Sequence, residues 1–82
     1  MTLMQVRVKL YGTLGKGVPG YDHQQGLAMA VDEGTTVADL MIRLGLPLKK
    51  IGMVSLDGRL AGREAILQPD MLVKVFHPIF GG

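Results

Sequence analysis

The sequence predicts an α+β fold in which a mixed sheet of four to five strands wraps around one main helix. Three observations predict it: apolar and polar residues alternate near both ends of the chain, one amphipathic helix lies between these segments, and a two-residue hairpin signal follows the helix. The expected order is strand, long loop, strand, helix, hairpin and strand. In this order the last strand is central and parallel to the first, which requires a crossover connection.

The first two strands are predicted from a pattern with a period of two residues. Apolar and long polar side chains alternate over residues 4–10, which is typical of a strand with one buried face. Apolar side chains alternate with alanines over residues 27–31. The glycine-rich stretch 12–20 lies between the two strands, and we interpret it as a long, adaptable loop.

The helix is predicted to begin at Thr36. Its hydroxyl group can cap the first turn, and Asp39 stands three residues later, as in a capping box. The side chains at helical spacing that form one apolar face are Val37, Leu40, Met41 and Leu44. Gly45 and Pro47 follow, and both favour the end of a helix.

The rest of the chain contains short elements separated by turns. Asp57-Gly58 is a strong signal for a two-residue hairpin. In the last strand, Val73 and Val75 are expected to point inward and Lys74 outward. The expected elements are a short 3₁₀ segment near 48–50, a strand near 52–56, a return strand from 59–61, a turn at 68–70 and the last strand at 72–77.

Composition and charge exclude several classes of protein. With 82 residues, we expect a single domain over residues 1–82, in which 78–82 form an extended tail. Cysteine is absent, which excludes disulfides, thiolate metal sites and thiol catalysis. The net charge of +2 is spread along the chain without a basic block interleaved with aromatics, so we expect no nucleic-acid partner. No apolar run approaches the ~20 residues that span a bilayer, and we expect a cytoplasmic protein with no signal peptide and no membrane partner.

Three segments contain residues that could form a chemical site. Gly15-Lys16-Gly17 follows a strand, but a phosphate loop also needs a glycine five positions before Gly15 and Ser or Thr after the lysine, and this pattern is absent. Asp22 and His23 lack a third metal ligand nearby, so we expect a solvated loop and no metal site. His77 is interpreted as a strand residue rather than as a proton relay. We therefore expect no catalytic residue, and a protein that is not an enzyme.

The C-terminal segment is the candidate functional element. Pro78 has no N–H and should end strand pairing, so the tail continues in an extended form. Residues 78–82 can then reach up to about 16 Å. Ile79 and Phe80 add apolar surface, and Gly81 and Gly82 can pass an opening too narrow for any other residue. The carboxylate of Gly82 is then the group that the tail presents.

The side chains beside the tail are candidates for partner docking. Strand alternation places Phe76 and Lys74 on the outward face, and Phe76 extends the apolar surface of Ile79 and Phe80. An exposed apolar patch on a small protein often marks an interface. The alternative is that Phe76 folds onto the sheet as a covered surface aromatic.

These features together resemble the β-grasp sulfur-carrier family, the ubiquitin-like proteins of molybdopterin and thiamine biosynthesis. The segments that carry the resemblance are Val6–Tyr11, Thr36–Leu40, Ser55–Gly58, Leu67–Phe76 and Gly81-Gly82. The resemblance implies a β-grasp fold over nearly the whole chain. It also implies that an adenylating enzyme of the ubiquitin-activating type uses ATP to activate Gly82, and that a sulfur donor converts the adenylate to a thiocarboxylate.

The resemblance further implies the partners and leaves several functions open. The partners would be the adenylating enzyme and a sulfur-accepting enzyme, either the large subunit of a pterin synthase or a thiazole synthase. The carrier would be a monomer when free and would bind no cofactor stably. The long loop 12–26 favours molybdopterin- or tungstopterin-type synthesis. The alternatives are a carrier for thiamine synthesis or tRNA thiolation, a protein modifier joined to targets through Gly82, and a plain binding module.

Overall fold

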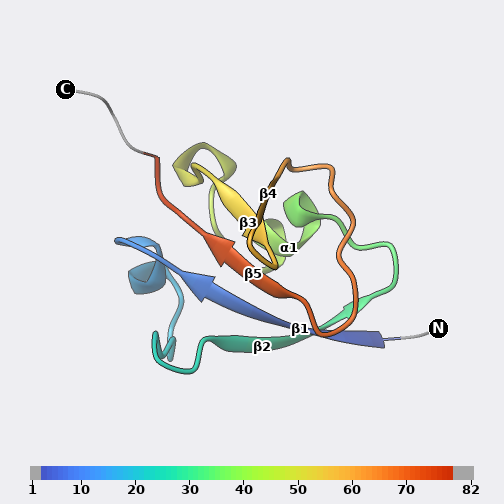
Figure 1. The fold of residues 1–82 in the computed structure, drawn as a ribbon. Helices are drawn as coiled ribbons and strands as arrows, with labels where there is room; N and C mark the ends of the chain where they lie inside the picture. Colours follow the sequence, from blue (N-terminus) through green and yellow to red (C-terminus); the bar gives the residue numbers. More distant parts are fainter. Residues whose placement is uncertain (1–2, 79–82) are drawn as a thin grey trace.

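The structure, a computed structural model, describes residues 3–78, which form one five-stranded mixed sheet with α1 against one face (Figure 1). The strands are β1 (Leu3–Leu10), β2 (Leu27–Asp32), β3 (Val54–Leu56), β4 (Arg59–Ala61) and β5 (Leu72–Val75). The helices are the 3₁₀ helix η1 (Leu14–Gly17), the α-helix α1 (Val37–Arg43) and the 3₁₀ helix η2 (Leu48–Lys50). Within this part of the chain, no helix has the length and apolar character needed to cross a bilayer.

The strand order β2-β1-β5-β3-β4 places the last strand in the centre, as predicted. β5 is parallel to β1, with Val8 opposite Val73 and Leu10 opposite Val75. It is antiparallel to β3 on its other side, with Leu56 opposite Val73. A strand that is paired on both sides is held firmly, so β5 gives a rigid base to the segment that follows it.

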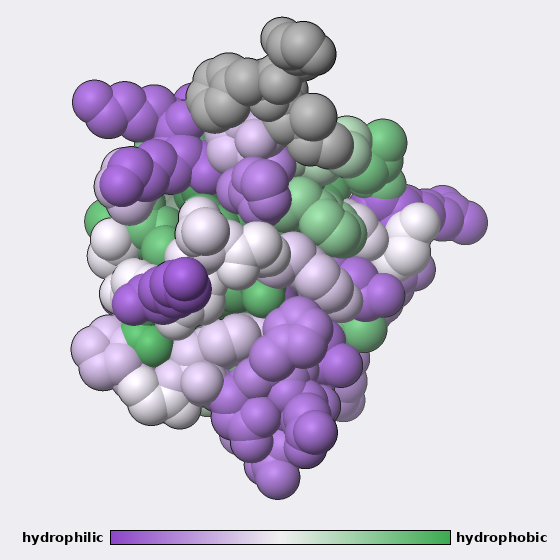
Figure 2. Space-filling view, turned by 90° about the vertical axis from the view of Figure 1, so that its left-hand side faces the viewer, coloured by the Kyte–Doolittle hydropathy of each residue, from purple (hydrophilic) through white to green (hydrophobic). Residues whose placement is uncertain are grey.

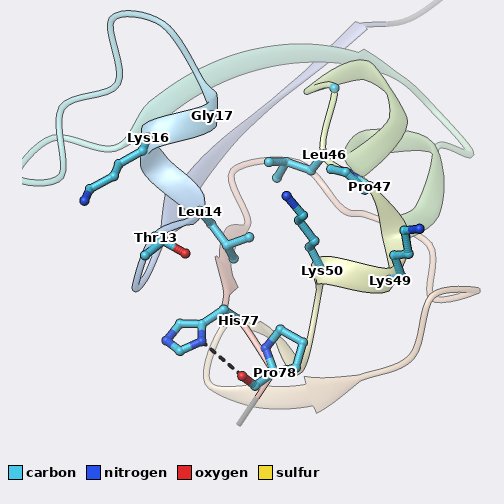
Figure 3. Close-up of a pocket in the computed structure, with 11 residues that line it drawn as sticks. Thr13, Leu14, Lys16, Gly17, Leu46, Pro47, Lys49, Lys50, His77 and Pro78 are labelled. Carbon is cyan, nitrogen blue, oxygen red and sulfur yellow. Dashed lines mark hydrogen bonds between the residues drawn. The ribbon is translucent and has the colours of Figure 1, made fainter. Parts of the chain in front are cut away.

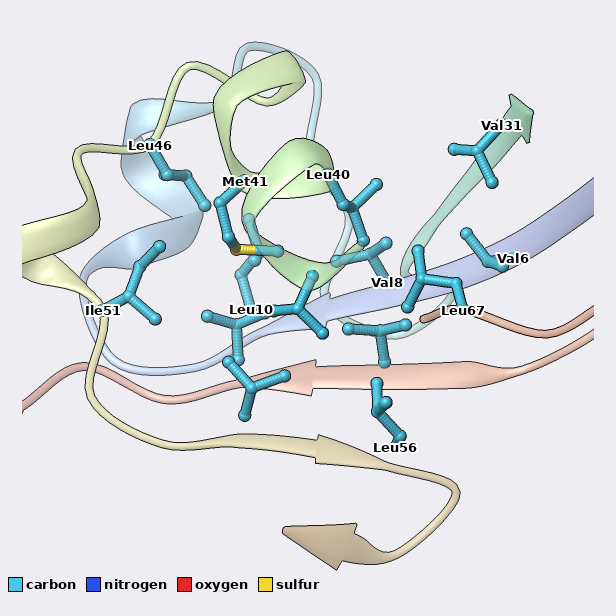
Figure 4. Packing of buried hydrophobic residues seen from close by; sticks show 14 of the residues in the cluster. Val6, Val8, Leu10, Val31, Leu40, Met41, Leu46, Ile51, Leu56 and Leu67 are labelled. Atoms are coloured by element: carbon cyan, nitrogen blue, oxygen red, sulfur yellow. The ribbon is translucent and has the colours of Figure 1, made fainter. Parts of the chain in front are cut away.

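The core lies between α1 and the inner face of the sheet (Figure 4). Alternate residues of β1 are buried, and so are Val73 and Val75 of β5, as predicted. From α1, Val37, Leu40 and Met41 pack against them with no exposed surface. Burying a side chain of this size contributes about 1.5–3 kcal/mol, so these contacts hold the helix on the sheet.

The capping box predicted at Thr36 is present at the start of α1. The backbone N–H of Asp39 donates to the Thr36 hydroxyl oxygen, and the backbone N–H of Thr36 donates to the Asp39 carboxylate, both at 3.2 Å. The chain leaves the helix at Gly45, which has a positive φ of 76°. A helix of seven residues is too short to be stable alone, so the cap and the core packing both matter.

The predicted hairpin turn connects β3 and β4. Asp57 and Gly58 both have positive φ, at 49° and 89°, as the favoured two-residue turn requires. The Asp57 carboxylate also accepts a hydrogen bond of 2.8 Å from the backbone N–H of Leu72. The turn is thereby tied to the start of β5.

The last strand is shorter than predicted, and the placement of His77 in it is wrong. Pairing beyond β5 continues only through Phe76, whose N–H donates to the carbonyl of Met53 and whose carbonyl accepts from Gly52. Before Gly52 the chain turns into η2, so no strand lies opposite His77. Pro78 has no N–H with which to continue the ladder.

The glycine-rich stretch predicted as an irregular loop contains η1 and is folded against the sheet. Leu14 of η1 is buried in the core. Tyr21 covers the edge of β1 where β2 no longer pairs with it: its hydroxyl oxygen accepts from the N–H of Leu10 at 2.6 Å and donates to the Leu10 carbonyl at 3.2 Å. Most of this connection is therefore held in place by side chains that the loop contributes itself.

Candidate functional site: the root of the tail

Two glycines flank the point where the chain leaves β5. A Cβ atom at Gly52 would lie 2.8 Å from the carbonyl oxygen of His77 and 2.9 Å from Cα of Pro78, closer than real Cβ contacts. A Cβ atom at Gly12, which has a positive φ of 67°, would overlap the His77 imidazole. We call the space between these two glycines the glycine slot. Gly52 lets the backbone of His77 and Pro78 lie against the end of the sheet, and Gly12 leaves room for the His77 ring.

The His77 side chain lies in the open part of the glycine slot. It is exposed, its imidazole lies over Gly12, and its Nδ1 atom is 3.1 Å from the Pro78 carbonyl oxygen. This contact joins neighbouring residues and involves no acid or base from elsewhere in the fold.

A cavity of about 1000 Å³ adjoins the tail root (Figure 3). Leu14 and Leu46 form an apolar floor, and His77 and Pro78 form one wall. The cationic side chains that line it are Lys16 from η1 and Lys49 and Lys50 from η2. We call this cavity the root pocket. Figure 2 shows the same side of the molecule, where hydrophobic surface lies between hydrophilic side chains.

The outer face of the sheet carries aromatic side chains beside the tail root. Phe76 is half-buried and stacks on Tyr11, with ring centroids 4.7 Å apart and an angle of 14° between the planes. The His23 and Tyr11 rings make an edge-to-face contact, with ring centroids 5.1 Å apart. Phe76 thus lies on the outward face beside the tail root, as predicted, and one face of its ring is covered by Tyr11.

Lys74, the other predicted docking residue, is half-buried on the same face. Its neighbours across the sheet are Lys9 of β1 and Ser55 of β3. Two lysines side by side repel each other and favour a partner of negative charge. Whether Phe76 and Lys74 dock a partner stays a prediction.

The segment around Asp22 forms a local turn. The Asp22 carboxylate accepts from the backbone N–H of Gln24 at 2.9 Å, and His23 Nδ1 lies 3.3 Å from the Leu10 carbonyl oxygen. Over residues 3–78, no three His, Asp or Glu side chains come together in a way that could hold a metal ion.

Four predicted tail residues lie outside the described part of the chain: Ile79, Phe80, Gly81 and Gly82. Their roles stay predictions. In contrast, the glycine slot and the root pocket were not predicted. The sequence signals for them were weak: a glycine just before a strand at Gly52, and the one adjacent pair of lysines at Lys49-Lys50.

The sequence matches the family described as Mut7-C ubiquitin over residues 3–81. The chain belongs to this family. The ubiquitin-like resemblance is therefore confirmed at the level of the family. A search of curated proteins found no match.

Solved structures share the same fold. The HVO 2177 protein of Haloferax volcanii has a TM-score of 0.76 at 24% identity, over 98% of this chain and 88% of that one. Small archaeal modifier protein 1 of H. volcanii has a TM-score of 0.71 at 18% identity, over 93% and 99%. A Pyrococcus furiosus protein described as subunit 1 of molybdopterin converting factor has a TM-score of 0.65 at 20% identity, over 93% and 99%. The predicted β-grasp fold is thereby confirmed.

Proposed function

We propose that this protein is a sulfur carrier in molybdopterin- or tungstopterin-type cofactor synthesis, and that Gly82 is the residue that carries sulfur. The observation that supports the proposal most is that the central strand β5 leads directly into the glycine slot and from there into the predicted tail. The β-grasp fold shared with a protein described as a molybdopterin converting factor subunit also supports it.

The chemistry requires an activated carboxyl group, because oxide is a poor leaving group. In the proposed reaction the Gly82 carboxylate attacks the α-phosphorus of ATP on an activating enzyme, and pyrophosphate leaves. A hydrosulfide ion supplied by a sulfur donor then attacks the carbonyl carbon, AMP leaves with the bonding electron pair, and a thiocarboxylate remains. ATP belongs to the activating enzyme, so the carrier itself holds no cofactor; it acts as a group carrier.

The geometry of the tail root suits a carrier that visits two enzymes in turn. The glycine slot lets His77 and Pro78 pack against the end of the sheet, and we propose that less of the tail must then be ordered when an enzyme takes it up. A segment that is already held in place loses less conformational entropy on binding. The folded body then serves as the surface that each enzyme recognises, with Phe76 and Lys74 beside the tail as the proposed docking residues.

A second candidate is a protein modifier joined to target lysines through Gly82. The fold shared with small archaeal modifier protein 1 favours it. Both candidates require adenylation of Gly82, and they differ in the nucleophile that follows, which is sulfur for a carrier and a lysine amine for a modifier. Isopeptide-linked products in host cells would favour the modifier.

Adenylation by the activating enzyme of the host tests the proposal. The intact mass of the purified protein first establishes that Gly82 carries a free carboxyl group. We expect ATP–pyrophosphate exchange that depends on the carrier and is abolished by deletion of Gly82. Gly62→Ala is the matched control, because a Cβ at Gly62 meets no atom within 4 Å. Absence of exchange with the intact carrier would overturn the proposal.

A further inference from the structure

The root pocket combines an apolar floor with a cationic rim. Leu14 and Leu46 are each 6% exposed and contribute the floor, while the three lysines are exposed to solvent. In Figure 3, the Lys50 side chain extends into the pocket towards Leu46, whereas the Lys16 side chain points away from it. No Asp or Glu is among the described residues that line this pocket. Its charge is therefore of one sign.

Acidic side chains lie at the opposite end of the sheet. Asp32 pairs with Leu3 at the start of β1, the Asp57 carboxylate accepts from Leu72 at the start of β5, and Asp70 donates its N–H to Gln5. Arg59 of β4 also lies at that end, so the charge there is mixed, whereas the charged residues that line the root pocket are all lysines. This difference favours a partner whose acidic surface faces the root pocket.

The arrangement fits a protein surface better than a small anion. A phosphate site needs several donors that converge on one point, but the lysines come from two elements and Figure 3 shows them pointing in different directions. Charges spread around an apolar floor are typical of an interface, in which one apolar side chain is buried and charged groups surround it.

We propose that the root pocket receives an acidic loop of the enzyme that takes up the tail, with an apolar side chain on Leu14 and Leu46 and carboxylates facing Lys16, Lys49 and Lys50. This inference rests on the proposed function. His77 and Pro78 form a wall of the pocket, so an enzyme that binds the tail must lie close to the lysines that surround the pocket. The lysines then steer the correct enzyme and repel basic surfaces.

The test compares charge reversals in the adenylation assay with the host's activating enzyme. We expect Lys50→Glu to raise the KM for the carrier about tenfold or more, because it places like charges opposite each other. The effect falls on KM rather than on kcat. Lys50→Arg keeps the charge and keeps the KM. Arg59→Glu is the matched control, an exposed reversal on the edge strand β4.

Two further measurements ensure that the test does not depend on Lys50→Glu alone. Lys16→Glu, on η1, should raise KM in the same direction as Lys50→Glu on η2, and thermal unfolding checks that both variants fold. The KM of the wild-type carrier should also rise more steeply with salt than that of Lys50→Glu, because screening weakens exposed ion pairs.

Each outcome is decisive. If the wild-type carrier is adenylated and Lys50→Glu behaves like Arg59→Glu, the inference is wrong and the proposed function stands. If the wild-type carrier is not adenylated, both are overturned. If inorganic phosphate titrated into the free protein gives saturating NMR shifts at residues 48–51 that Lys50→Glu removes, the pocket is a small-anion site and the inference is wrong.

Discussion

The residues at the two ends of the sheet have different roles. At the end distant from the tail, polar residues complete the fold: Thr36 and Asp39 cap α1, and Asp57 closes the hairpin and binds Leu72. At the tail end, Gly12 and Gly52 leave room for His77 and Pro78, and lysines surround an apolar pocket. Hydrogen bonds within the fold explain the first set, whereas we attribute the second to the proposed role of the tail.

Gly52 differs from most of the described glycines in the reason why a side chain is excluded there. Its φ is not in the left-handed region, so its backbone conformation is open to other residues. What excludes a side chain there is the backbone of residues 77 and 78, which cannot move aside as a flexible side chain could. Substitutions at the two ends should therefore separate effects on the tail from effects on stability.

The largest effect is expected for Gly52→Ala. The added Cβ meets backbone atoms of His77 and Pro78, so the tail root must shift and the hydrogen bond from Gly52 to Phe76 is weakened. We expect a loss of about 2–3 kcal/mol in the free energy of unfolding, measured in urea, together with slower adenylation. Gly62→Ala should change stability by less than about 0.5 kcal/mol. Equal effects of the two substitutions would contradict the glycine slot.

A smaller effect is expected for Gly12→Ala compared with Gly20→Ala. Both positions have positive φ, at 67° and 77°, so both variants carry a similar backbone cost. Only the Cβ at Gly12 meets another group, the His77 imidazole. We expect Gly12→Ala to lose less than about 0.5 kcal/mol more than Gly20→Ala, because the exposed imidazole can turn aside, and to shift the NMR signals of the His77 ring. Unchanged His77 signals would show that the imidazole does not lie over Gly12.

Thr36→Ala tests the end distant from the tail. It removes the side-chain oxygen that caps α1, and we expect a loss of about 1 kcal/mol in stability. Adenylation per folded molecule should not change, because the cap lies far from the tail root. Thr13→Ala is the control for stability alone, because Thr13 is the N-cap residue of η1 without a side-chain cap hydrogen bond but lines the root pocket. If folded Thr36→Ala were adenylated more slowly than the wild-type protein, the end of the sheet distant from the tail would also affect the tail, and the distinction between the two ends would be wrong.

The smallest effect is expected for the aromatic stack on the outer face. Tyr11→Leu removes the ring on which Phe76 lies and should cost about 0.5 kcal/mol. Tyr11→Phe keeps the ring and should leave the unfolding midpoint unchanged. If Tyr11→Phe costs as much as Tyr11→Leu, the hydroxyl group matters and the ring stack does not.

Elements with local signals were predictable from the sequence. The alternation in β1, the capping box at Thr36 and the Asp57-Gly58 turn each depend on residues within a few positions of one another. The central place of β5 was predicted from the order of the elements. In that order the last strand is parallel to the first and is reached by a crossover connection.

The features of the tail root depend on contacts between distant parts of the chain. Strand pairing ends at Phe76 because Gly52 is the last residue of the neighbouring segment that pairs with it. The sequence pattern of residues 72–77 gives no sign of this end point. The root pocket is built from η1 with the residue before it, from residues 45–50 and from His77 and Pro78, and no motif joins these three segments. The same is true of Gly12, whose position against His77 depends on the parallel pairing of β1 and β5.

The most direct test of the central claim is the intact mass of the protein isolated from its own host, with fragmentation to locate any change. We predict a fraction that is heavier by the difference between a sulfur and an oxygen atom, with the change at Gly82. This fraction should increase after incubation with the host's activating enzyme, ATP and a sulfur donor. If the protein carries only oxygen at Gly82 after that incubation, the sulfur-carrier account is contradicted.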